Sequence, residues 1–253
     1  DYQEEEKRRG ISISTSVIPV EYKDHKINFL DTPGYTDFVG EVISAMYVAD
    51  GVVIPVDAVA GAEVGTELAW SYAERFQLPR FFLINLLDRD NANYQKALES
   101  VRGMTDKRLI PFQIPWGEKA DLKGVIDILA MKAYEGKENT PVDIPEEYAD
   151  EVETARLELI EMAAEANDEL LMKYREGDQL SADEILEGLM EGILDGTFVP
   201  VYVSSGTAQI GLAPLLDGII KLMPSPGQAP PITASGKDGE QPLPADDNGP
   251  PAA

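Results

Sequence analysis

Short apolar runs alternate with longer amphipathic stretches along this chain. Two of the runs flank the polar turn Lys23-Asp24-His25, and they predict a β-hairpin whose second strand is buried and whose turn exposes His25. Three further runs are continuously apolar, which is typical of strands buried inside a parallel sheet. The strands predicted in this way are residues 16–22, 26–30, 51–56, 80–84 and 198–203. Pro55 lacks the backbone N–H that a sheet ladder needs, so we expect its strand to end imperfectly.

Helices are predicted where apolar residues return every three to four positions. The first should follow the turn after residue 34, with Thr36 or Asp37 as its cap. A long acidic helix is predicted from about Pro145 to Tyr174, with most of its carboxylates on a solvated face. The run Ser181-Ala-Asp-Glu184 has the form of a capping box and begins a further helix. The predicted helices are residues 37–48, 63–75, 91–104, 145–174, 181–194 and 211–222.

Three stretches do not follow these patterns. Residues 1–9 are polar and mixed in charge, which predicts a solvated and mobile start. Residues 227–253 are rich in Pro, Gly and Asp, which predicts an irregular linker. From residue 91 to about residue 196 the pattern changes, and short strands are expected near residues 111–115, 124–128 and 131–134.

The composition excludes several classes of chemistry. A net charge of −25 argues against broad binding of nucleic acid or anionic membranes, although a local basic patch could touch RNA. Cysteine is absent, which excludes disulfides and thiolate chemistry, and a single histidine excludes a multi-histidine zinc site. No apolar run has membrane-spanning length and no signal peptide is recognisable, so we expect a cytoplasmic protein. The first residue is Asp1 rather than Met, so we expect a fragment of a longer protein.

The run Asp31-Thr32-Pro33-Gly34-Tyr35 carries the most specific chemistry in the chain. It lies between a predicted strand and a predicted helix, which is where open α/β sheets bind ligands. A carboxylate at this place can hold a magnesium ion through water, and Gly34 lets a backbone N–H approach a phosphate. Asp-x-x-Gly alone is common, and the alternative is an ordinary strand-to-helix turn. The wider run through Phe38 resembles the magnesium and γ-phosphate switch of the translational GTPases.

Three further stretches resemble the same family and follow its order along the chain. Arg9-Gly10-Ile11-Ser12-Ile13 resembles the first switch, with Ser12 in place of the usual threonine; the alternative is a simple lead-in to a strand. Asn85-Leu86-Leu87-Asp88 stands where the family carries Asn-Lys-x-Asp, the guanine reader, and Leu86 replaces the lysine. Ser205-Gly206-Thr207 resembles the loop that offers a backbone N–H to the guanine oxygen.

The resemblance covers residues 8–226 and implies a Ras-like P-loop GTPase fold: a mostly parallel α/β sheet with one antiparallel edge hairpin and an α+β insertion. It is similar to the elongation factor G group in particular. Residues 1–90 and 196–226 would form the GTPase domain, 91–195 a connecting helix and the inserted subdomain, and 227–253 a linker. The family's phosphate loop, Gly-x-x-x-x-Gly-Lys-Ser/Thr, is not present in these residues. That loop and the strand before it would precede Asp1, and the chain alone is expected to be inactive.

The resemblance also implies ligands and roles. GTP or GDP would bind with Mg²⁺, and GTP would be hydrolysed to GDP and phosphate. Ser12 and Asp31 would hold the metal, Gly34 would sense the γ-phosphate, and Tyr35 stands where the family carries the histidine that orients the attacking water. Asp88 would accept hydrogen bonds from the guanine N1–H and 2-amino group, a pair that adenine cannot supply. The nucleotide-binding residues would be Asp31, Thr32, Pro33, Gly34, Tyr35, Asn85, Leu86, Leu87, Asp88, Ser205, Gly206 and Thr207.

The partner implied by the resemblance is the ribosome, at the factor-binding site of its large subunit with ribosomal RNA and the stalk proteins. The protein would act as a monomer, without DNA and without a membrane. The alternative is a degenerate, nucleotide-independent paralogue that uses its acidic insertion to bind a protein partner.

Overall fold

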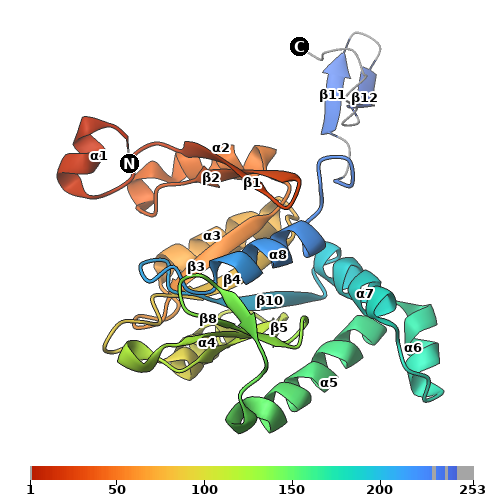
Figure 1. Cartoon of the computed structure of the whole chain (residues 1–253). Helices are drawn as coiled ribbons and strands as arrows, with labels where there is room; N and C mark the ends of the chain where they lie inside the picture. Colours follow the sequence, from red (N-terminus) through yellow and green to blue (C-terminus); the bar gives the residue numbers. More distant parts are fainter. Residues whose placement is uncertain (1, 230–231, 237–238, 244–253) are drawn as a thin grey trace.

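The computed structural model describes residues 2–229, 232–236 and 239–243. Its centre is a parallel four-stranded sheet in the order β3-β4-β10-β5 (Figure 1). Every residue of β10 is buried, because it lies between two neighbouring strands and its run is apolar throughout. The predicted α/β fold with a parallel sheet is therefore confirmed. The bounds of these strands are Val52–Asp57 for β3, Arg80–Asn85 for β4, Phe198–Val203 for β10 and Arg108–Pro111 for β5.

The antiparallel hairpin forms a two-stranded sheet of its own, from β1 (Ser16–Tyr22) and β2 (His25–Asp31). Its two-residue turn has Lys23 and Asp24 at φ +46° and +61°, as a type I′ turn requires. His25 pairs with Tyr22 and so begins β2 instead of lying in the turn, although it is exposed as expected. No residue of β2 is fully buried, because the hairpin does not pair with the parallel sheet; the prediction of a buried second strand is wrong.

Pro55 does not disturb its strand. β3 stays in register with β4 up to the pair Asp57 and Asn85. The backbone N–H groups of Val52 and Ala58 donate toward β4, to the carbonyls of Pro79 and Asn85, both at 2.9 Å. Because N–H directions alternate along a strand, the nitrogen of Pro55 faces away from β4 at the edge of the sheet. The expected imperfect strand end is therefore wrong.

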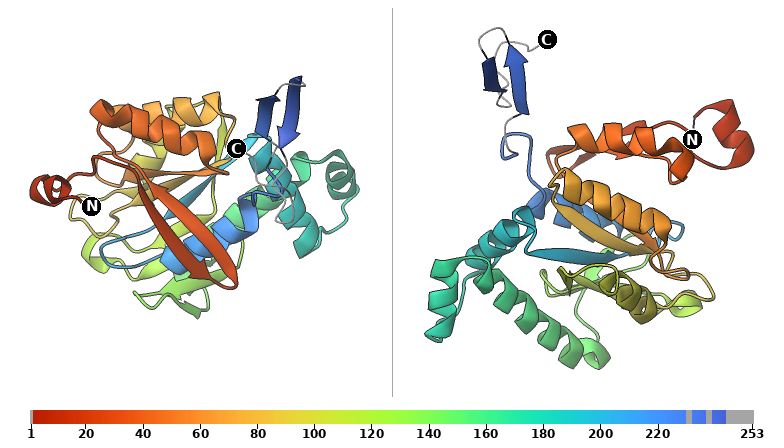
Figure 2. Two further views of the ribbon diagram at one scale, coloured as in Figure 1. Left: turned by 90° about the horizontal axis from the view of Figure 1, so that it is seen from above. Right: turned by 180° about the vertical axis from the view of Figure 1, so that it is seen from behind.

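Helices cover both faces of the parallel sheet (Figures 1 and 2). The view from behind in Figure 2 shows α3 and α4 in front of the sheet, whereas Figure 1 shows α8 in front of the opposite face. The central aromatic side chains stack between these layers, with ring centroids 5.1 Å apart for Phe81 and Tyr202. A Cβ on Gly218 would lie 2.2 Å from the Tyr202 hydroxyl, so only glycine lets α8 approach β10 this closely. The helix bounds are Val64–Arg75 for α3, Tyr94–Arg102 for α4 and Leu212–Leu222 for α8.

Two helix predictions need correction. A 3-10 turn, Thr36–Phe38, precedes α2 (Val39–Val48), and the N-cap is Phe38 without a side-chain hydrogen bond, so neither Thr36 nor Asp37 is the cap. The long acidic helix is two helices, α5 (Ala149–Glu165) and α6 (Asp168–Arg175), preceded by the 3-10 turn Glu146–Tyr148. Asn167 separates them because its side chain accepts hydrogen bonds from the first backbone N–H groups of α6.

The capping box before α7 (Ala182–Leu194) is confirmed. The Ser181 hydroxyl accepts from the Glu184 N–H at 3.3 Å, and the Glu184 carboxylate accepts from the Ser181 N–H at 2.8 Å. None of the helices in the described part of the chain is long and apolar enough to cross a membrane.

A second, antiparallel sheet in the order β6-β7-β8-β9 lies in the part of the chain where an insertion is expected. Residues 108–111 fall in the same range, yet they form β5 and pair with β10 in the parallel sheet. The short strand β9 was not predicted, since its three residues include Pro141. The bounds are Gln113–Trp116 for β6, Gly124–Asp127 for β7, Lys132–Glu135 for β8 and Thr140–Val142 for β9; a 3-10 turn, Lys119–Asp121, follows β6.

Both ends of the described chain are more regular than the sequence indicated. Residues 4–9 form helix α1 (Glu4–Arg9); Lys7, Arg8 and Arg9 are exposed, in agreement with the predicted solvated start, whereas Glu6 is buried, and Asp1 lies outside the described residues. Residues 232–243 contain the antiparallel pair β11 (Ile232–Gly236) and β12 (Gly239–Leu243) where an irregular linker was predicted. Residues 230–231, 237–238 and 244–253 of the predicted linker lie outside the described residues.

Candidate functional site

The carboxyl ends of three parallel strands bring the predicted site residues to one edge of the sheet. Asp57 and Asn85 are register partners at the ends of β3 and β4. Ser204 follows β10 directly, and its N–H donates to the Ile84 carbonyl at 2.9 Å. Ligands bind at this edge in open α/β sheets, which is where the sequence placed the guanine-reading loops.

The two loops expected to read guanine are joined by side-chain hydrogen bonds. The Ser205 hydroxyl donates to Oδ1 of Asp88 at 2.6 Å. The Asn85 Oδ1 accepts from the Ser204 hydroxyl at 3.0 Å and from the Gly206 N–H at 2.9 Å. Asn85 therefore ties the loop after β4 to the loop after β10, which fixes the Asp88 carboxylate beside the tip of the second loop.

Not every residue expected near the nucleotide can reach it. The Leu87 side chain is fully buried in the core, so only its backbone remains near the site. Leu86, which replaces the family's lysine, is half-buried and has φ +65°, a left-handed conformation that is uncommon for leucine. The sequence could not predict this difference between the two leucines, because it depends on how the turn after β4 directs each side chain.

The backbone N–H expected to face the guanine oxygen has a partner inside the protein. The Ser205 N–H donates to the Ile210 carbonyl at 3.0 Å, and the Gly206 N–H donates to Asn85. The exposed Thr207 follows at the tip of the loop, and its N–H bonds to no other residue in the described part of the chain. Thr207 is therefore the backbone donor that this loop presents outward.

The switch turn after β2 is open to solvent. The Asp31 carboxylate is exposed and forms no hydrogen bond or ion pair with any described residue. Pro33 is buried, Thr32 is half-buried, and Gly34 is exposed with no atom within 4 Å of a Cβ built on it. Tyr35 is 58% exposed, as expected for a residue that faces a ligand instead of the core.

The same turn lies beside the parallel sheet. The Gly34 carbonyl oxygen is 3.9 Å from the place where a Cβ on Gly65 would be. Gly65 belongs to the first turn of α3, the helix that follows β3. The switch turn is thus at the edge of the sheet that carries the guanine loops.

A buried carboxylate that the sequence did not reveal organises the first-switch stretch. Glu6 is fully buried, and its Oε1 accepts from the N–H groups of Ile13 at 2.9 Å and Ser14 at 3.2 Å. Its Oε2 accepts from the N–H groups of Tyr2 and Gln3, both at 3.0 Å. These hydrogen bonds, led by the one from Ile13, lower the pKa of Glu6 to about 2. Glu6 therefore stays ionised and closes the loop that contains Ser12.

The chain offers few metal ligands of its own. Within the described residues, no three His, Cys, Asp or Glu side chains come together as a metal-binding group. A magnesium ion keeps several waters and binds through one or two protein oxygens plus substrate phosphates. The unengaged Asp31 carboxylate and the hydroxyl of Ser12 fit that requirement.

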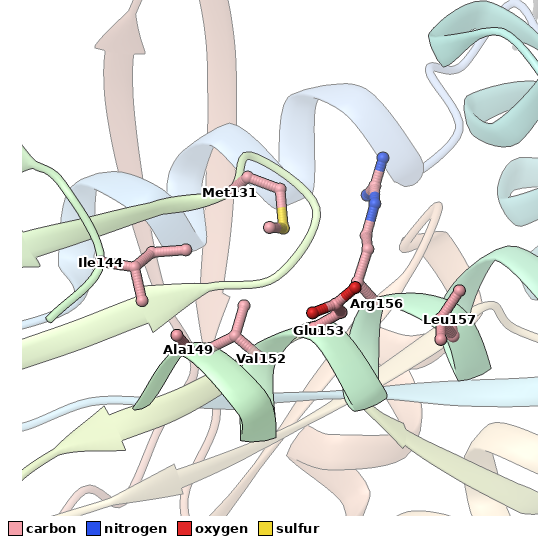
Figure 3. A pocket seen from close by; sticks show the side chains of 7 residues that line it. All are labelled: Met131, Ile144, Ala149, Val152, Glu153, Arg156 and Leu157. Atoms are coloured by element: carbon pink, nitrogen blue, oxygen red, sulfur yellow. The ribbon is translucent and has the colours of Figure 1, made fainter. Parts of the chain in front are cut away.

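The hollow shown in Figure 3 lies elsewhere, between the turn at Met131 and helix α5. Its volume is about 420 Å³, and its lining is mainly apolar. The Arg156 guanidinium at its rim donates to the carbonyls of Ile128 at 3.3 Å and Leu129 at 3.1 Å. None of the predicted site residues lines this hollow.

Similarity to known proteins shows which protein family has this fold and these loops. Residues 1–225 match the family model described as the elongation factor Tu GTP binding domain, and the chain belongs to this family. Within it, the chain is a translational GTPase domain of the elongation factor G type. Elongation factor G from Fervidobacterium nodosum is 36% identical over 246 residues, which are 95% of this chain and 36% of that protein.

A second curated relative agrees with this assignment, and a solved structure has a similar fold. Elongation factor G from Mycoplasma pneumoniae is 34% identical over 248 residues, which are 96% of this chain and 36% of the relative. A crystal structure of a protein from Thermus thermophilus is similar with a TM-score of 0.85 at 31% identity, and the match covers 96% of this chain and 42% of that one. The chain spans about a third of the length of the curated relatives it matches.

Proposed function

We propose that this chain binds GTP and GDP with Mg²⁺ and hydrolyses GTP, as the GTPase domain of a translation elongation factor that acts on the ribosome. The observation that carries the proposal is the joining of two loops far apart in the sequence. Asn85 and Asp88 meet Ser205 and Gly206 at the carboxyl edge of a parallel sheet. A nucleotide-independent module would have no need of such a junction.

Base selectivity would come from Asp88. Its Oδ1 is held by Ser205, and a carboxylate in this place can accept hydrogen bonds from both the N1–H and the 2-amino group of guanine. Adenine has an acceptor at N1 and no 2-amino group, so it would leave the carboxylate unpaired, which is costly. The Thr207 N–H at the loop tip would donate to the guanine oxygen.

The switch residues would act on the phosphate end. Ser12 and Asp31 would hold Mg²⁺, which when bound neutralises charge on the transferred phosphoryl group. The Gly34 N–H would bind the γ-phosphate, because an exposed turn without a side chain admits a phosphate closely. The exposed Tyr35 hydroxyl would hydrogen-bond the attacking water. Loss of the γ-phosphate would release the turn and change the surface offered to the ribosome.

The test is a nucleotide titration of the protein that carries this chain, unchanged and with Asp88→Asn. The amide has one acceptor and one donor group, so GTP should bind about 100-fold more weakly, since two hydrogen bonds to a charged group are lost. Binding of xanthosine triphosphate, which has a carbonyl in place of the 2-amino group, should become stronger. Asp90→Asn, at an exposed neighbour, is the matched control. Equal affinity of the unchanged protein for GTP and ATP would contradict the proposal.

A further inference from the structure

The turn between β8 and β9 touches the loop that follows β10. Asn139 in this turn donates through Nδ2 to the carbonyls of Gln209 at 3.1 Å and Lys137 at 2.9 Å. Its Oδ1 accepts from the Gly211 N–H at 2.8 Å. One side chain of the antiparallel sheet therefore satisfies a carbonyl and an N–H of a loop about seventy residues away.

The loop that Asn139 holds is short and closed. Ser205 and Ile210 exchange two backbone hydrogen bonds of 3.0 Å each, and Gly206 and Thr207 lie inside this closure. Gly211 follows at φ +80°, where a Cβ would lie 2.6 Å from the Val203 carbonyl oxygen. The backbone at Gln209 and Gly211 thus has little conformational freedom. Hydrogen bonds that fix these two residues therefore also limit the positions that Thr207, at the tip of the same closed loop, can adopt.

A second turn of the same sheet supports the other guanine loop. The Lys119 N–H donates to the Leu87 carbonyl at 2.7 Å. Glu118 accepts from the Tyr94 N–H, at the start of α4, at 2.6 Å. Both loops at the candidate site are therefore hydrogen-bonded to turns of the β6–β9 sheet.

We propose that Asn139 is a positioning residue for guanine recognition, fixing the loop 205–211 so that its tip faces the base oxygen. The inference rests on the proposed function, because it adds a role for the β6–β9 sheet at the same site. Asn139 itself has φ +49°, a conformation that asparagine tolerates better than most residues, so its side chain is directed into the loop without a large backbone cost.

Three variants of the full protein separate this role from a general effect on stability. Asn139→Ala removes all three side-chain hydrogen bonds. Asn139→Asp keeps an acceptor for the Gly211 N–H and removes the donor to Gln209. Glu138→Ala is the control, because its side chain is exposed and, within the described residues, its one ion pair is with Lys137, at 3.7 Å.

The first measurement is amide hydrogen exchange, which needs no nucleotide. Asn139→Ala should speed exchange in the segment 205–212, Asn139→Asp should do so less, and β4 and β10 should exchange as in the unchanged protein. A side chain that only supports the fold would speed exchange across the sheet as well, and that result would overturn the inference.

The second measurement is the affinity for GDP and for inosine diphosphate, which keeps the base oxygen and lacks the 2-amino group. Asn139→Ala should weaken both roughly tenfold, the effect of losing a well-placed hydrogen bond, and leave their ratio unchanged because Asn139 bonds to the loop at Gln209 and Gly211 and not to Asp88. If the unchanged protein binds GDP and Asn139→Ala binds it within twofold, the inference alone is overturned. If the unchanged protein binds no guanine nucleotide, the proposed function fails and the inference fails with it.

Discussion

Asn85 and Asp88, in the loop after β4, have different roles at the candidate guanine site. The side-chain oxygen of Asn85 accepts hydrogen bonds from Ser204 and Gly206. Ser205 bonds to one carboxylate oxygen of Asp88, Oδ1, and leaves the other oxygen for a ligand. A change at Asn85 should therefore loosen the loops, and a change at Asp88 should alter which base is accepted. Leu86 has neither role. Its left-handed backbone conformation shows that the turn after β4 forms without the family's lysine at this position.

Glu6 gives a prediction for the first switch. In Glu6→Gln one of the two carboxylate oxygens becomes an NH₂ group that faces two backbone N–H donors, so at least two of the four hydrogen bonds are lost. The loop 2–14 should open, and trypsin should cut faster after the exposed Lys7, Arg8 and Arg9. Limited proteolysis followed by mass spectrometry measures the rates.

The control for this prediction is Glu4→Gln, an exposed position in the first turn of the same helix. It removes a negative charge from α1 without removing any of the hydrogen bonds to Glu6 that close the loop. Equal cleavage rates for the two variants would show that Glu6 does not close the first switch.

Among the elements, the structure separates what the sequence could predict from what it could not. Strands β4 and β10 and the start of α7 were predictable, because continuous apolar runs and a capping box are local signals. The break at Asn167 was not, since the apolar spacing continues on both sides and only the side-chain cap ends the helix. The pairing of residues 232–236 with 239–243 likewise has no strong local pattern.

The candidate site likewise has features that the sequence could predict and features that it could not. The motifs predicted which loops meet, because the carboxyl ends of parallel strands share one edge. The roles of Glu6 and Asn139 were not predictable: a glutamate run usually indicates solvent, and an asparagine in a turn usually bonds to its own backbone. Glu6 is instead buried and accepts from backbone up to eight residues away, and Asn139 bonds both to its neighbour Lys137 and to backbone about seventy residues away, which only tertiary structure reveals.

The junction of α6 with α7 gives a prediction with a defined pH dependence. The Glu184 carboxylate accepts from Lys173 at 2.7 Å and from the Ser181 N–H, and these contacts, led by Lys173, lower its pKa from the ordinary 4.5 to about 2. Glu184→Gln should lower Tm by a few degrees at most at pH 7, because the ion pair with Lys173 is lost while the glutamine amide oxygen can still accept from the Ser181 N–H in the capping box. Thermal unfolding of both proteins measures the difference.

The sign of the pH effect follows from the lowered pKa. A carboxylate with a depressed folded-state pKa stabilises the fold above its unfolded-state pKa, and the stabilisation declines as the pH falls toward the folded-state value. The Tm difference between the unchanged protein and Glu184→Gln should be full above pH 4.5 and shrink between pH 4.5 and about 2. The control is Glu187→Gln, an exposed position one turn further along α7. A Tm difference that stays constant down to pH 3 would contradict this account.

At the scale of the whole molecule, the β1–β2 hairpin is held by its end and by the following helix. The Tyr22 hydroxyl donates to the Ala213 carbonyl at 3.3 Å, and Lys23 pairs with Asp217 of α8 at 2.6 Å. Helix α2 packs against α3. No backbone hydrogen bond in the described part of the chain joins the hairpin to β3, so the parallel sheet ends at an open edge.

That edge leads to the last prediction. On β3 the N–H groups that alternate with those of Val52 and Ala58, including that of Val53, face away from β4. Backbone groups on this edge have no partner strand among the described residues and must bond to water or to another chain, and a domain is stable by only about 5–15 kcal/mol. Open edges also pair with other chains. The chain of residues 1–253 on its own should therefore unfold at low temperature and aggregate, as light scattering during thermal unfolding would record.

Two variants test whether the edge of β3 is the cause. Val53→Lys places a charge on the edge without removing a hydrogen bond to β4, and it should slow aggregation, because charged side chains disfavour pairing between edges. Ile54→Lys puts a charge at a buried neighbouring position and should unfold the chain instead. A sharp, concentration-independent unfolding transition of the unchanged chain, with no scattering, would show that the open edge of β3 is tolerated and that the hairpin and helices supply enough stability without a further strand.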